Sequence, residues 1–141
     1  MIRSRDVVRM KVPYPSVNSK LAAAAHMYIC KKKENHLYEF FKCQTLKPYM
    51  FSGNQIVHYC DEMPDILRNP FQRTTRIDCD KLFITQTVEY ADGLKTTLRS
   101  DVCDDLFRAV LQELALGDYL KVMVNEMELC VLNSLITLWN D

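Results

Sequence analysis

The sequence contains little glycine, with three glycines among 141 residues. Phosphate-binding loops such as G-x-x-x-x-G-K-[ST] and G-x-G-x-x-G need several closely spaced glycines, because the backbone itself must approach the phosphates. Neither motif occurs, and the G-x-S-x-G turn of serine hydrolases is also missing. These absences exclude the common nucleotide-binding folds and the α/β-hydrolases, and we expect no cofactor.

Closely spaced cysteine pairs are missing as well. The six cysteines are scattered, and none forms a C-x-x-C pair. Zinc ribbons and dithiol redox sites need such pairs, because two thiolates must reach one metal or each other. We therefore expect no metal site, and we interpret the thiols as reduced, with Cys43 and Cys103 packing as small apolar side chains.

Neither a net charge nor a long apolar run is present. The 18 acidic and 18 basic side chains cancel, which argues against a strongly electrostatic nucleic-acid binder but leaves room for a local basic patch. The chain has no signal-peptide pattern and no apolar run of about 18 residues. We therefore expect a soluble, cytoplasmic protein with no membrane partner.

The residues that are present predict a single domain over residues 1–141, with short strands in its N-terminal half. Its apolar fraction of 48% is enough for a packed core. Residues 6–12 alternate polar and apolar side chains until two prolines end the pattern. Apolar residues fill 26–30 and aromatic ones are frequent in 37–45, so the polar stretch 31–35 is predicted to be a hairpin turn.

Residues 46–73 carry several prolines and predict long connections, with one strand at 54–59 and a helical turn at 63–67. Short strands follow from residue 74 and end at the turn Asp92-Gly93. Long connections in compact domains are often functional.

Two helices are predicted in the C-terminal part. After Ser100, the expected N-cap, apolar residues recur at three- and four-residue steps until Gly117. A second apolar-periodic segment, 124–139, predicts a helix that either covers the sheet or pairs with a second subunit.

The order of strands, turn and helix from residue 74 onward resembles the MazF/PemK family of toxin endoribonucleases. The segment Asp78-Cys79-Asp80-Lys81-Leu82-Phe83 and the step Leu98-Arg99-Ser100-Asp101 carry the resemblance, which extends over residues 5–116. It implies an α+β, strand-dominated fold: a small SH3-like β-barrel of the MazF/PemK/CcdB type with one or two helices. Residues 118–141 would then be a C-terminal helical extension.

The resemblance also implies a function. It predicts a metal-independent endoribonuclease of a toxin-antitoxin system, which cleaves single-stranded RNA, forms a homodimer and is neutralised by an antitoxin protein.

The family's catalytic arginine, which directly precedes the second strand, would fall at Ala25-His26, so this arginine is absent. His26 is the candidate replacement, because an imidazole exchanges protons near neutral pH. The family's hydroxyl residue at the end of the third strand falls at Thr45 or the neighbouring Gln44. The expected RNA-binding cations are Lys20, Arg73 and Arg76.

Other interpretations remain open. His26 can simply begin a buried strand, and the arginines can be ordinary solvated side chains. The chain would then be a catalytically inactive barrel that binds a protein or a nucleic acid. A third alternative is an assembly protein built around the C-terminal helix.

Overall fold

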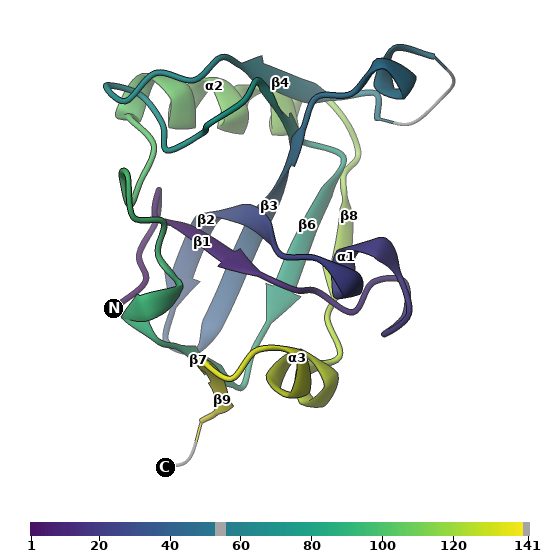
Figure 1. The fold of residues 1–141 in the computed structure, drawn as a ribbon, viewed down its shortest axis with the longest axis vertical. Coiled ribbons are helices and arrows are strands. Elements are labelled where there is room, and N and C mark those ends of the chain that lie inside the picture. The colour runs from purple at the N-terminus through teal and green to yellow at the C-terminus, as the bar shows by residue number, and fades with distance from the viewer. Residues whose placement is uncertain (53–55, 140–141) are drawn as a thin grey trace.

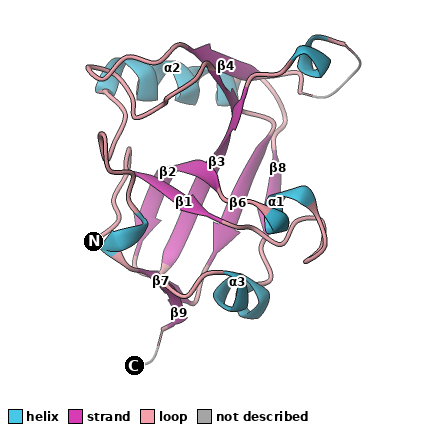
Figure 2. Cartoon of the chain, viewed as in Figure 1, coloured by secondary structure: helices cyan, strands magenta, loops and turns pink. Residues whose placement is uncertain are grey.

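The computed structural model describes residues 1–52 and 56–139 and shows an α+β fold dominated by strands (Figures 1 and 2). The α+β expectation is therefore confirmed. The strands are β1 (Val7–Met10), β2 (His26–Glu34), β3 (Leu37–Thr45), β4 (Tyr59–Glu62), β5 (Thr75–Asp78), β6 (Lys81–Thr85), β7 (Val88–Tyr90), β8 (Leu120–Met123) and β9 (Ile136–Leu138). The helices are α1 (Lys20–Ala23), α2 (Asp104–Ala115) and α3 (Glu126–Leu132), with the 3-10 turns η1 (Pro48–Phe51) and η2 (Asp92–Leu94).

Strand β3 is the centre of a seven-stranded sheet. One edge of β3 pairs with β2, and its other edge is shared by two strands: β6 pairs with residues 38–40 and β5 with residues 43–45. All these pairs are antiparallel, whereas β8 joins β6 in parallel. Because β5 and β6 pair with different parts of the same edge, β4, which pairs with β5, lies at the end of the sheet where α2 packs (Figure 1). In the part of the chain that the structure describes, no strand pair connects β1, β4 and β8 into a closed barrel.

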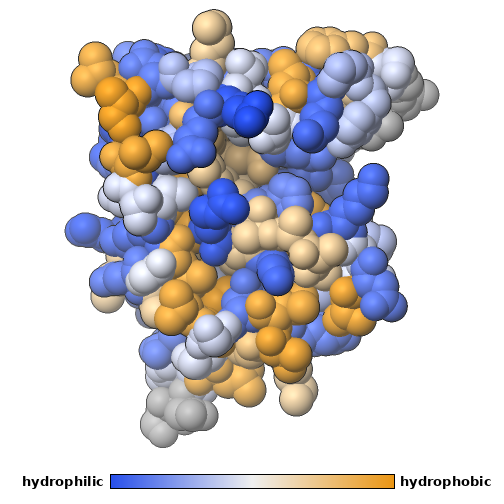
Figure 3. All heavy atoms as spheres, in the orientation of Figure 1, coloured by the Kyte–Doolittle hydropathy of each residue, from blue (hydrophilic) through white to orange (hydrophobic). Residues whose placement is uncertain are grey.

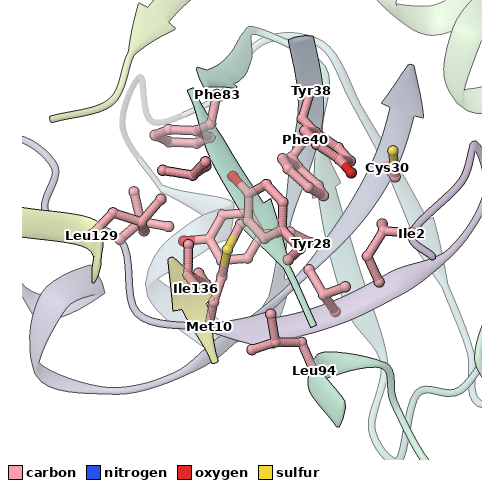
Figure 4. Packing of buried hydrophobic residues seen from close by; sticks show 14 of the residues in the cluster. Ile2, Met10, Tyr28, Cys30, Tyr38, Phe40, Phe83, Leu94, Leu129 and Ile136 are labelled. Carbon is pink, nitrogen blue, oxygen red and sulfur yellow. The ribbon is translucent and has the colours of Figure 1, made fainter. Parts of the chain in front are cut away.

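Both faces of the hairpin β2–β3 are buried, because its side chains alternate between two hydrophobic clusters. Tyr28 and Phe40 face one cluster, which Phe83 of β6 also enters (Figure 4). Ile29 and Phe41 face the other, where α2 packs its apolar side through Leu106, Val110 and Leu114. The aromatic residues that predict the hairpin therefore supply the core on both sides of it.

The start of α2 differs from the prediction. Ser100 is not the N-cap: the helix begins at Asp104, and the Sγ of Cys103 accepts a hydrogen bond from the Leu106 N–H. The reason lies in β1, since the Val7 N–H donates to the Ser100 carbonyl and the Val102 N–H donates to the Arg5 carbonyl. Residues 100–102 are thus used as an extended partner of the N-terminal segment and cannot begin a helix.

The prediction of one helix over 124–139 is wrong. The helix α3 ends at Leu132, and β9 then pairs with β7. Asn133 ends the helix: its Nδ2 donates to the carbonyls of Leu129 and Lys11, and its Oδ1 accepts from the Lys11 N–H. Leu129 and Ile136 are each 1% exposed, so this C-terminal segment packs into the same core as the sheet.

Two predictions in the N-terminal half also need correction. Lys31–Lys33 belong to β2 rather than to the turn, which lies at Asn35-His36, where Asn35 has a φ of 54°. The strand predicted at 54–59 includes residues 54 and 55, which lie outside the described residues, and β4 begins only at Tyr59. A hydrogen-bonded turn is present near 63–67, since the N–H groups of Arg68 and Asn69 both donate to the Asp65 carbonyl.

Candidate functional site

A groove crosses the ends of β1, β2 and β3 beside α1. It consists of a smaller cavity of about 170 Å³ and a larger one of about 850 Å³, and Arg9, His26 and Thr45 line both. Hydrophilic residues occupy the strip between α1 and η1 on this face of the molecule (Figure 3). We call this surface the basic groove, because its lining includes Arg9, Lys20, Lys42, Lys47, Arg73 and Lys81.

The charge of the basic groove is unbalanced, although the whole chain is neutral. Among the described residues, no aspartate or glutamate lines either cavity, whereas the chain has 18 of them. Of the lining cations, Lys42 and Lys81 lie 3.9 and 3.3 Å from the carboxylate of Asp78, which is fully buried and does not line the groove. The other cations are exposed, so the groove attracts anions.

His26 lies where the two cavities meet, and its ring orientation is fixed. Its Nδ1 is 3.0 Å from the carbonyl oxygen of Ala24. A carbonyl oxygen can only accept, so Nδ1 carries the hydrogen, and in the neutral ring Nε2 keeps a free lone pair. Partial burial lowers the pKa of His26; the hydrogen bond to Ala24 opposes this shift, and the charges of Lys42 and Arg9 add to it. His26 is therefore neutral at pH 7, with Nε2 as a base.

The other predicted residues of the site lie in the same groove. Thr45 is the last residue of β3, and the register Met27↔Cys43 brings this end of β3 beside the start of β2. Gln44 lines the larger cavity and donates through Nε2 to the Tyr49 hydroxyl at 3.1 Å. Lys20, in the larger cavity, begins α1, while Arg73 lines the smaller one from the loop before β5.

The sequence predicts Arg76 to be an RNA-binding cation, but in the structure it is buried and paired. Its side chain is 3% exposed, and its Nε and Nη2 donate to the two carboxylate oxygens of Asp61 at 2.8 Å each. Its Nη1 donates to the Met50 carbonyl at 3.0 Å. The charge of Arg76 is thus neutralised by a bidentate partner, and the guanidinium is unavailable as a cation in the groove.

Sequence reasoning missed several residues of the groove, of which Arg9 is the most central. Arg9 is exposed on β1, between the buried Val8 and Met10, and pairs in register with Met27, next to His26. The alternation of buried and exposed residues along 7–10 is a signal for an outward-facing arginine. Its position beside His26 depends on the pairing of β1 with β2.

Two further observations cover residues 1–52 and 56–139. No three His, Cys, Asp or Glu side chains of that part are grouped to hold a metal ion, and none of its helices has the length and apolarity needed to cross a bilayer. No family model, curated protein or solved structure matches the chain.

Proposed function

We propose that this chain is a MazF/PemK-like endoribonuclease whose basic groove binds single-stranded RNA and cleaves it without a metal. One observation carries the proposal: a groove without carboxylates, in a neutral protein, contains a neutral histidine with a free Nε2 beside several cations. The pairing of both β5 and β6 with one edge of β3 supports the SH3-like barrel as the parent architecture.

The reaction would be a transesterification within the RNA. His26 Nε2 takes the proton of a 2′-hydroxyl, the 2′-oxygen attacks the adjacent phosphorus, and the bond from phosphorus to the 5′-oxygen breaks. The products are a 2′,3′-cyclic phosphate and a 5′-hydroxyl, which takes its proton from solvent. Thr45 and Gln44 would hold the phosphate by hydrogen bonds, and Lys20 and Arg73 would bind the flanking phosphates.

Arg9 would supply the positive charge that the catalytic arginine supplies in members of the MazF/PemK family. The expected position, Ala25-His26, lacks a guanidinium, but Arg9 lines both cavities of the groove and its charge reaches His26, whose pKa it helps to lower. A guanidinium offers two parallel N–H donors to phosphate oxygens, which a lysine ammonium cannot. This arrangement favours the enzyme over a binding module.

A catalytically inactive binding module is the second candidate, because the family's arginine is missing from its usual place in the sequence. In either case an acidic antitoxin segment would fit the basic groove, and we expect a cytoplasmic homodimer by analogy with the family.

The test is to incubate the purified chain with a long RNA in EDTA and to score 2′,3′-cyclic-phosphate ends. His26→Ala is expected to slow cleavage by about 10²- to 10⁴-fold, the usual contribution of a general base. His36→Ala is the matched control, since the His36 ring packs at a tilt against Trp139, with ring centroids 3.9 Å apart, and does not line the groove. RNA binding without cleavage by wild type would support the binding module, and equal cleavage by wild type and His26→Ala would contradict the assigned base.

A further inference from the structure

Three aromatic side chains gather around Arg76 beyond one end of the basic groove. Tyr49 and Phe51 come from η1 and Tyr59 begins β4. The guanidinium carbon of Arg76 lies 3.6 Å from the centroid of the Tyr59 ring and 5.5 Å from that of Phe51. Phe51 is nevertheless 72% exposed and Tyr49 48% exposed, so large aromatic surfaces remain open to solvent.

The guanidinium beside the Tyr59 and Phe51 rings is itself fixed in place. Asp61 fixes it from one side through two hydrogen bonds, and the Met50 carbonyl, within η1, accepts a third. Because a cation attracts the face of an aromatic ring, the fixed guanidinium favours this placement of the Tyr59 and Phe51 rings. A ligand that stacks there therefore requires less ordering of the protein side chains, which lowers the conformational entropy that the protein loses on binding.

Tyr49 connects the aromatic side chains to the basic groove, whereas Phe51 and Tyr59 lie beside Arg76 without lining the cavities. A cavity of about 160 Å³ at Arg76 shares Lys42, Gln44, Tyr49 and Lys81 with the larger cavity of the groove. The hydrogen bond from Gln44 to the Tyr49 hydroxyl lies at this junction. A strand whose phosphates follow the cations of the groove would thus reach the rings with its next base.

We infer that Tyr49, Phe51 and Tyr59 form a stacking subsite for an unpaired nucleobase of the RNA that lies in the basic groove. The inference rests on the proposed function. A base fits better than a phosphate, because the charge of Arg76 is already neutralised by Asp61, so the rings are the main attraction there. Stacking on aromatic side chains accepts every base, since each has a π-face.

The test measures the binding of fluorescein-labelled, uncleavable 2′-O-methyl oligonucleotides by anisotropy. One oligonucleotide is intact, and a series carries a single abasic residue at each position in turn. Phe51→Ala is expected to raise the Kd of the intact oligonucleotide by about 5- to 150-fold, the range that corresponds to one stacked base. The same substitution should have little effect on the oligonucleotide that lacks the stacked base, whereas Phe51→Trp should retain binding.

The matched control is Met127→Ala, because Met127 is 71% exposed, close to the value of Phe51, and belongs to α3, at the other end of the molecule from β4 (Figure 1). Phe51 is outside the core, and circular dichroism of each variant checks that it folds. Tight binding that is insensitive to Phe51→Ala and to every abasic position would overturn the stacking subsite while leaving the proposed function intact. No binding by wild type would overturn both.

Discussion

Asn133 connects the C-terminal segment to β1, and its removal should destabilise the whole domain. The side chain is buried and makes three hydrogen bonds, two with the backbone of Lys11 and one with the Leu129 carbonyl. Each such bond contributes about 1 kcal/mol net, and backbone groups left without partners add to the loss. Asn133→Ala should therefore lower the free energy of unfolding by about 2 to 4 kcal/mol.

This loss can be converted to a melting temperature. For 141 residues the entropy of unfolding is about 0.3 kcal/mol/K, so Tm should fall by about 7 to 13 °C. Urea unfolding followed by circular dichroism, together with calorimetry, measures both quantities.

Two further variants make the test specific. Asn133→Asp keeps the shape of the side chain but replaces the donating Nδ2 by a charged oxygen, which repels the carbonyl oxygens of Lys11 and Leu129. This variant should therefore lower the free energy of unfolding at pH 7 at least as much as Asn133→Ala. Asn18→Ala, at an exposed site on the α1 loop, should stay within about 0.5 kcal/mol of wild type. An Asn133→Ala protein as stable as wild type would refute the view that this segment belongs to the core.

Two predictions concern the groove. Burial and the charges of Lys42 and Arg9 lower the pKa of His26 below its usual value of 6.5. Because only the unprotonated ring can act as the base, the cleavage rate should rise with pH up to that lowered pKa and then level off. A rate that falls over this range would contradict the base assignment. Arg9→Gln should slow cleavage by about 10²- to 10³-fold through lost charge stabilisation and should raise the pKa of His26 in an NMR titration, while Arg9→Lys should recover only part of the rate. An unchanged rate with Arg9→Gln would exclude the guanidinium from the reaction.

The central hairpin and the amphipathic helix were predictable from the sequence, because their patterns have one dominant interpretation. Aromatic and apolar residues in 26–30 and 37–45 favour paired strands, and Leu106, Val110 and Leu114 define one buried helix face. The proximity of His26 and Thr45 follows from that hairpin, since the start of one strand lies beside the end of the next.

Other features depend on contacts between distant segments. Ser100 is a good N-cap residue, but its backbone is used by Val7 of β1. The apolar spacing of 124–139 suits one long helix as well as a short helix followed by a strand, and the contact between Asn133 and Lys11 selects the second. Arg76 is buried by Asp61, a residue 15 positions earlier in the chain, so its role could not be read from composition or local pattern.

The most direct test of the account is an NMR titration of the isotope-labelled protein with an uncleavable single-stranded 2′-O-methyl oligonucleotide. We expect the largest chemical-shift changes on Arg9, His26, Thr45 and Arg73, and we expect the Nε2 signal of His26 to identify the tautomer with the hydrogen on Nδ1. Changes confined to the α3 face around Met127, or a His26 ring protonated on Nε2 instead, would contradict it.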